Sequence, residues 1–338
     1  MTPSLANRQW KLVRRPVGMV TTGDFEYVEA SAPAPGDDQC LVRTLYVSFD
    51  PAMRAFLHDR PSYVPPQPIG EVMRAGAVGQ VVESRSTRLS PGDLVIGAFG
   101  WQDYAAMPAS SVTKITGNHP LPDYLGVLGG IGATAYVGLM HVAKLAGQET
   151  VVISGAAGAT GSTAAQISRI KGCRTIGIAG GPAKCRWLLE ELHLDAAIDY
   201  KGEDVPLRLR ELCPSGIDVY FDNVGGRILE AAIGTMAAHG RIVLCGMVSG
   251  YNDAHPVPGP SNLFELVARQ IRMEGFLAFS FLSHFDEARR EIEGWMAAGQ
   301  LKSYVDVQEG FENIPRTFLR LFKGDNVGKQ VLKIADPA

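Results

Sequence analysis

The sequence has few cysteines, little net charge and no continuous apolar stretch among its first residues. Its five cysteines are scattered and odd in number, which fits a reducing cytoplasm and argues against a disulfide framework. The net charge of −3 gives no reason to expect nucleic acid or an anionic membrane as a partner. Basic side chains are dispersed among the first apolar residues, so we expect no signal peptide. These absences predict a cytoplasmic globular protein.

Metal ligands are also sparse. A catalytic zinc needs three convergent Cys, His or carboxylate ligands, and a structural zinc needs four clustered thiolates. Cys40 is the only cysteine among residues 1–125, and His58 and His119 have no partners at metal spacing. We therefore expect no metal, and we interpret these histidines, together with His141 and His193, as surface or structural residues.

One uncharged stretch, residues 124–140, raises the question of a membrane span. It contains several glycines and is followed closely by His141 and Lys144. A helix that crosses the bilayer needs about 20 mainly apolar residues. We therefore predict a buried helix here, and no membrane partner.

Residues 151–162 predict a nucleotide-binding strand, turn and helix. An apolar β-branched run leads into small residues at 156, 158 and 161, which match the dinucleotide fingerprint with Ala156 in place of its first glycine. A glycine at 158 lets a pyrophosphate approach the backbone, and one at 161 lets the helix lie close to the strand. The predicted cofactor contacts of this turn are Gly158, Ala159, Thr160 and Gly161.

The next predicted strand, residues 174–179, ends without the acidic residue that usually holds the ribose 2′-hydroxyl of NAD. Gly180 and Gly181 stand there instead, with Lys184 and Arg186 just beyond. Open space and a cation accommodate a 2′-phosphate, so the predicted cofactor is NADPH, with Lys184 at its phosphate. The alternative for Lys184 is a solvated lysine at a helix start.

The distribution of residue types along the chain predicts an α/β protein with two domains. Residues 1–125 are rich in Pro and Gly, with short strand-like runs such as 40–48 and 79–84, which favours a small, partly open antiparallel barrel. Residues 126–298 alternate strands and helices, the pattern of a doubly wound parallel sheet. Residues 299–338 are again mixed in the manner of residues 1–125, so we expect them to fold back onto the first domain. Strands of the parallel sheet are expected at 151–154, 174–179, 196–199, 217–222 and 241–246, and an amphipathic helix at 287–298.

Seven motifs along the chain carry a family resemblance. They are residues 48–54, 62–66, 100–104, 155–162, 220–226, 245–252 and 323–329. Together they resemble medium-chain dehydrogenases/reductases, specifically the zinc-independent prostaglandin reductase and leukotriene hydroxydehydrogenase branch, and most closely the bacterial NADPH-dependent curcumin reductases. The resemblance implies a GroES-like catalytic barrel, a Rossmann domain and reduction of the carbon–carbon double bond of enones.

Two candidates are expected near the reacting end of the cofactor. Ligands of an open α/β sheet lie beyond the carboxyl ends of its strands, which places Asn223 near the cofactor and leaves Asp222 as a turn or helix-capping acid. The resemblance implies that the loop after strand 241–246 passes along the nicotinamide, with Cys245, Gly246 and Tyr251 in contact with the cofactor. We predict that Tyr251 faces the reacting carbon and is catalytic. The alternative is a loop tyrosine that packs on an exposed surface.

Three more candidates depend mainly on the resemblance. Tyr200 follows strand 196–199 and resembles a position beside the adenosine phosphate, although hydrophobic packing explains it nearly as well. Asn326 resembles a cofactor contact, although its own segment indicates a plain turn. Tyr63, between prolines, is predicted to be an aromatic wall of the substrate pocket.

The resemblance also bears on metal, partners and alternatives. Ile69-Gly70-Glu71 stands where related zinc alcohol dehydrogenases have Gly-His-Glu, so one zinc ligand is missing. An apolar strand over residues 270–279, expected at a sheet edge, predicts a homodimer. The expected substrate is a small hydrophobic enone. The alternatives are a quinone reductase of the same superfamily and a non-catalytic NADPH-binding interaction protein.

Overall fold

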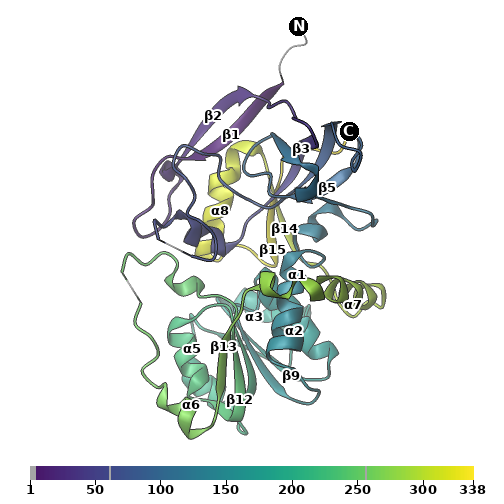
Figure 1. Ribbon diagram of the computed structural model, residues 1–338. Coiled ribbons are helices and arrows are strands. Elements are labelled where there is room, and N and C mark those ends of the chain that lie inside the picture. Colours follow the sequence, from purple (N-terminus) through teal and green to yellow (C-terminus); the bar gives the residue numbers. More distant parts are fainter. Residues whose placement is uncertain (1–4, 61, 256) are drawn as a thin grey trace. The chain divides into compact units, whose positions relative to one another are not determined.

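The computed structural model describes residues 5–60, 62–255 and 257–338 (Figure 1). The chain divides into two compact units. Unit 1 comprises Met1–Leu125, Val305–Asn326 and Gln330–Ala338, and unit 2 comprises Gly126–Tyr304 and Val327–Lys329. Each unit is built on its own sheet, mainly antiparallel in unit 1 and parallel in unit 2. This confirms the predicted α/β class.

Unit 1 contains a seven-stranded sheet in the order β14-β15-β3-β4-β5-β7, with β6 also paired to β3. The long strand β3 pairs antiparallel with β4, β6 and β15, so it is the centre of the sheet. A separate antiparallel hairpin joins β1 to β2. The bounds are β1 (Ala6–Leu12), β2 (Phe25–Ser31), β3 (Gln39–Ser48), β4 (Ala77–Ser84), β5 (Leu94–Gly97), β6 (Tyr104–Pro108), β7 (Thr113–Lys114), β14 (Val305–Glu309) and β15 (Lys329–Lys333).

A cluster of buried aromatic side chains forms part of the core of unit 1. Trp101 is fully buried, and its ring lies 4.9 Å from that of Phe25 and 5.7 Å from that of Phe318. Phe318 comes from helix α8 (Ile314–Lys323), which has a proline in its first turn and ends at Gly324 in the left-handed conformation. Proline is tolerated in a first turn, and glycine takes a positive φ without strain. The last segment of the chain therefore supplies part of this core.

Unit 2 contains six parallel strands in the order β10-β9-β8-β11-β12-β13. Successive strands step outward from β8 in one direction and from β11 in the other, so the topological switch point lies between these two. Ligands of such sheets bind beyond the carboxyl ends of the strands at this point. The bounds are β8 (Thr150–Ser154), β9 (Arg174–Ala179), β10 (Ala196–Asp199), β11 (Ile217–Asp222), β12 (Met236–Leu244) and β13 (Arg272–Gly275).

Helices cover the parallel sheet (Figure 1). Helices α4 and α5 pack on each other, and their apolar sides join a core that includes Val152, Ile176 and Tyr220. Helix α1 packs against α2 and α7. The bounds are α1 (Gly130–Val137), α2 (Ala159–Ile170), α3 (Pro182–Glu190), α4 (Val205–Leu212), α5 (Gly226–Ile233), α6 (Phe264–Ala268) and α7 (Phe285–Ala297), with the π-helical turn η5 (Gly138–Val142) and the 3₁₀ segment η7 (Ala278–His284).

Two sequence predictions differ from the structure in extent. The strand predicted over 270–279 is only Arg272–Gly275, because its partner β12 ends opposite Gly275 and the chain then enters η7. It does lie at the sheet edge. The helix predicted within 124–140 is α1, which begins at Gly130 and has buried residues along most of its length. In the described part of the chain, no helix is both long and apolar enough to cross a membrane.

Candidate functional site

The turn between β8 and α2 has the geometry of a phosphate-binding turn. Gly155 has a φ of +58°, and Gly158 is the N-cap of α2 with extended backbone and no side-chain cap. The first N–H groups of a helix lack intrahelical acceptors, and the helix dipole adds positive potential there. These groups suit the pyrophosphate of a dinucleotide.

Gly161 explains how closely α2 approaches this turn. A Cβ at this position would lie 2.8 Å from the carbonyl carbon of Gly155 and 2.9 Å from Cα of Ala156. Backbone atoms cannot yield as a flexible side chain does, so residue 161 must be glycine for the helix to keep its place. The turn therefore fits a dinucleotide in the way that the fingerprint predicts.

A buried carboxylate holds the switch point together. Asp222 is fully buried and accepts hydrogen bonds from Ser154 Oγ at 2.7 Å and from the Tyr220 hydroxyl at 3.0 Å. It also accepts from the backbone N–H groups of Val224 and Gly225. The interpretation of Asp222 as a turn-capping acid is confirmed. Sequence reasoning missed Ser154, whose only signal is a polar residue at the end of a buried apolar strand.

Asn223 joins the ends of β8 and β11. Its side-chain amide donates to the carbonyl oxygen of Ser154 at 2.7 Å, and its backbone N–H donates to Ser154 Oγ at 2.8 Å. A Cβ on Gly155 would lie 3.5 Å from Cβ of Asn223. The residue therefore stands beside the phosphate turn, at the carboxyl ends of the central strands.

The loop after β12 is fastened to the same strand ends. The N–H groups of Cys245 and Gly246 donate to the carbonyl oxygen of Asp222 at 2.8 and 3.0 Å. Val248 N–H donates to the carbonyl oxygen of Asn223. Burial and the charge of Asp222 raise the pKa of the Cys245 thiol to about 12, so this thiol stays protonated and is no nucleophile at neutral pH.

Tyr251 folds back over its own loop. Its hydroxyl oxygen accepts the backbone N–H of Met247 at 3.3 Å, and a Cβ on Gly246 would lie 3.4 Å from this oxygen. An accepting hydroxyl keeps its own proton for donation. Burial raises the pKa of Tyr251, outweighing the Met247 N–H bond. The phenol is therefore a protonated donor held close to the end of β12.

A second group of predicted residues lies at the ends of β9 and β10. A Cβ on Gly180 would lie 2.9 Å from the Tyr200 ring, so glycine makes room for this half-exposed aromatic. Asp199 accepts the N–H of Gly181 at 2.7 Å, and this bond is the main cause of its lowered pKa. Lys184 lies in the first turn of α3, where the helix dipole disfavours a cation. An anionic ligand at this helix start would offset that cost.

Two predicted site residues, Tyr63 and Asn326, belong to unit 1. Tyr63 is 46% exposed, and its ring meets that of Phe56 edge-on at 6.1 Å. Asn326 is buried and follows α8 in the chain. Gly328, which sequence reasoning missed, belongs to unit 2 and donates its N–H to the carbonyl oxygen of Ala157 at 2.8 Å. The segment Val327–Lys329 therefore lies beside the phosphate turn.

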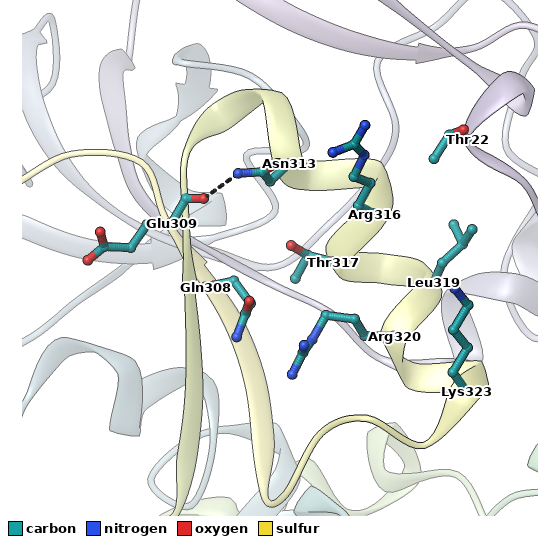
Figure 2. A pocket seen from close by; sticks show the side chains of 9 residues that line it. All are labelled: Thr22, Gln308, Glu309, Asn313, Arg316, Thr317, Leu319, Arg320 and Lys323. Carbon is teal, nitrogen blue, oxygen red and sulfur yellow. Dashed lines mark hydrogen bonds between the residues drawn. The ribbon is translucent and has the colours of Figure 1, made fainter.

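A surface hollow in unit 1 is separate from these candidates. It measures about 520 Å³ and lies between β14 and α8 (Figure 2). Arg320, one of its cations, is engaged by Asp306 at 2.8 Å and by Gln330 at 3.1 Å. None of the predicted site residues lines this hollow. Its lining residues are Thr22, Gln308, Glu309, Asn313, Arg316, Thr317, Leu319, Arg320 and Lys323.

Comparison with known proteins places this geometry in a family. Residues 8–115 match the family described as the N-terminal domain of oxidoreductase, and residues 159–294 match the family described as zinc-binding dehydrogenase. The NADPH-dependent curcumin reductase of Escherichia coli is 40% identical over 97% of each chain. The chain belongs to the medium-chain dehydrogenases/reductases. The family predicted from the sequence motifs is confirmed.

Two further relatives sharpen the likeness. An NADP(+)-dependent 2-alkenal reductase of Nicotiana tabacum is 35% identical over 99% of each chain. The crystal structure of CurA from Vibrio vulnificus in complex with NADPH is 36% identical, with a TM-score of 0.93 over 98% of this chain and all of that one. The predicted pairing of a GroES-like unit with a Rossmann unit is thereby confirmed.

Proposed function

We propose that this protein is an NADPH-dependent reductase of the carbon–carbon double bond in α,β-unsaturated ketones and aldehydes. The observation that carries the proposal is the convergence, in unit 2, of the phosphate turn, Asn223 and the Tyr251 loop at the switch point of the sheet. The relatives named for curcumin and for 2-alkenals point to the same substrate class. In this assignment unit 2 binds NADPH, and unit 1 is the catalytic domain with Tyr63 at the substrate.

The residues fit NADPH at both ends. At the pyrophosphate, α2 begins at Gly158 without a side-chain cap, which leaves its first amides to a ligand. At the adenosine end, Gly180 and Gly181 replace an acid and Lys184 supplies a cation, with Tyr200 beside them. Cys245, Gly246 and Tyr251 would line the nicotinamide end, and Asn326 of unit 1 stays a predicted cofactor contact.

When bound, NADPH supplies a hydride for the β-carbon of the enone. The negative charge that then develops on the carbonyl oxygen needs a hydrogen-bond donor already in place. Tyr251 has a protonated hydroxyl in this loop, and its raised pKa keeps it a donor through the neutral range. It also has the right chemistry to pass a proton, through water, to the α-carbon. Each turnover consumes one hydride and one proton.

The deciding experiment follows both hydrogens. Enzyme, a medium-chain 2-alkenal and NADPH carrying deuterium at C4 should give product with deuterium at the β-carbon. In deuterated solvent with unlabelled NADPH, the label should appear at the α-carbon. Deuterium at the carbonyl carbon would show an alcohol-forming enzyme instead, and a higher kcat/KM for a quinone would favour a quinone reductase. Absence of NADPH oxidation with every enone and quinone would favour a binding protein.

We propose a homodimer formed through the edge of the parallel sheet. β13 is an edge strand, and Leu277, Phe279 and Leu282 in the segment after it are exposed. An unpaired edge next to exposed apolar side chains is an aggregation hazard unless it is covered, and a two-fold pairing covers both copies.

We also propose that the protein is located in the reducing cytoplasm, which its five free cysteines support.

Light scattering tests the dimer. Phe279, 66% exposed, is the most exposed of these three side chains, and Val17, 88% exposed, is an apolar control residue of unit 1. At micromolar concentration the native chain should have the mass of two chains, and Phe279→Asp should shift it toward one. Val17→Asp should leave the mass unchanged. A native mass of one chain would refute the proposal.

A further inference from the structure

Unit 2 contains a group of metal-ligating side chains that the sequence did not reveal. His141 lies in the π-helical turn η5, His284 ends η7 as the N-cap of α7, and Glu287 lies in the first turn of α7. One ligand atom from each falls within 4.8 Å of the other two. His141, interpreted from the sequence as a surface or structural residue, thus stands beside two other side chains that can bind a metal. None of the three is a predicted cofactor contact.

The distances within the group match a small tetrahedral ion. Glu287 Oε2 lies 3.1 Å from His284 Nδ1 and 3.6 Å from His141 Nε2. Two ligands bound at the usual zinc distances around a tetrahedral centre lie about 3.3 Å apart. The two imidazole centroids are 3.9 Å apart and their planes are tilted by 34°. One carboxylate oxygen thus faces two imidazole nitrogens at nearly the spacing that a shared ion requires.

One nitrogen of the group is left without a hydrogen bond. In the described chain, Nε2 of His141 is buried and has no hydrogen-bond partner. A buried polar atom without a partner is costly, so it calls for an explanation such as an unseen ion. A ring nitrogen that makes no hydrogen bond can offer its lone pair to a metal ion.

Surrounding side chains orient the group as they do in metal sites. The Tyr136 hydroxyl donates to Glu287 Oε1 at 2.8 Å and leaves Oε2 to face the histidines. The Phe281 ring lies beside both imidazoles, at 6.4 and 6.3 Å. An outer hydrogen bond to a ligating carboxylate and an apolar wall are regular features around bound metals. π-Helical turns such as η5 are frequent at functional sites.

We propose that His141, His284 and Glu287 form a binding site for one divalent transition-metal ion, with Zn²⁺ the best match and a fourth position for water. Two imidazoles and one carboxylate are ligands that zinc accepts, whereas magnesium and calcium prefer oxygen donors only. An ion here would join η5 to the start of α7. Its role would be to stabilise unit 2, apart from hydride transfer.

Binding of Zn²⁺ alone to the full chain tests the site. After chelator treatment, titration calorimetry should find one Zn²⁺ per chain, and Zn²⁺ should raise Tm by about 2–5 °C. Glu287→Gln keeps the shape of the side chain and His284→Ala removes a ligand. Each should weaken binding by roughly tenfold or more. Tyr136→Phe should weaken it less, and His255→Ala, at an exposed histidine of unit 2, should change nothing.

Two outcomes would overturn the proposal. One is equal Zn²⁺ affinity in the native chain and in the His141→Ala/His284→Ala double variant, with Tm in chelator showing that the variant is folded. The other is a Co²⁺ absorption spectrum with intense thiolate charge transfer, which would place the metal on cysteines. A Co²⁺ spectrum of nitrogen and oxygen ligands that is lost in Glu287→Gln would support the site.

Discussion

Single side chains decide the chemistry expected of this protein, and Tyr251 is the first of them. Its phenol accepts Met247 N–H and retains a proton to donate. Removing one such donor costs about 2.7–4 kcal/mol of transition-state stabilisation. Because a ribose hydroxyl of the cofactor can share this role, we expect the loss of transition-state stabilisation in Tyr251→Phe to lie at or below the lower end of this range.

Tyr251→Phe should therefore reduce kcat toward a hundredfold at most, with NADPH affinity close to native. Burial raises the pKa of the Tyr251 hydroxyl, so the donor is present below this pKa and lost above it. The native kcat should then hold as pH rises to about 10, and the phenylalanine variant should lack any fall due to this group. Steady-state kinetics across pH measures both. An unchanged kcat in the variant would reduce Tyr251 to a pocket wall.

Lys184 carries the prediction about cofactor choice. A charge-assisted contact to a phosphate is worth roughly 1.5–3 kcal/mol. Lys184→Ala should therefore weaken NADPH binding by about one to two decades and leave NADH nearly unchanged. Fluorescence titration with both cofactors measures this, and Lys201→Ala, at an exposed lysine just after β10, is a nearby control. Equal losses for NADPH and NADH would assign Lys184 to packing.

At the scale of elements, the close approach of α2 to the phosphate turn restricts residue 161 to glycine. A Cβ at Gly161 would meet backbone atoms at 2.8 and 2.9 Å, and overpacking of this kind costs about 1–3 kcal/mol. Gly161→Ala should lower the free energy of unfolding by that amount and weaken the binding of NADPH. Gly294→Ala in α7, where nothing lies within 4 Å of the new Cβ, should instead stabilise by up to about 1 kcal/mol. Urea denaturation compares the two.

The elements that could be predicted are those with a clear local pattern. The strands β8 to β11 are short apolar runs bounded by turn residues, and the structure places them within a residue or so of expectation. β12 begins at Met236, before the predicted strand, because His239 and Gly240 interrupt the apolar pattern ahead of Arg241. The opposite holds for residues 276–279, which were predicted as strand because they are apolar. In the structure they pair with no described strand.

The site residues also divide into those that a local sequence pattern reveals and those that only the tertiary structure brings together. The glycines of the phosphate turn are visible in sequence because their spacing reflects one local conformation. Tyr136 and Glu287 are hydrogen-bonded across 151 residues of sequence, and no local pattern announces such a pair. The same holds for His141 and His284. The roles of Tyr251, Lys184 and the other site residues stay predictions until variants are measured.

For the whole molecule, metal and catalysis are expected to be independent. Within the described residues of unit 1, no three metal-ligating side chains converge, and the group that does converge lies in unit 2. Dialysis against a strong chelator should leave kcat and KM for an enone unchanged, even where it lowers Tm by emptying the His141 site. Parallel measurement of turnover and Tm separates the two. Loss of turnover that Zn²⁺ restores would contradict a metal-independent reduction.

The discontinuity of unit 1 has a consequence for how the chain is made. Its N-terminal part is synthesised first, whereas α8 and β15, which complete its core, follow the middle of the chain, and β15 pairs with β3. The long middle segment Gly126–Tyr304 is finished before them and can fold while the ribosome is still adding the end of the chain. The usual order, in which the N-terminal domain folds first during synthesis, is thus reversed. A nascent chain arrested before β15 should hold a protease-resistant Rossmann unit beside an open, degradable barrel.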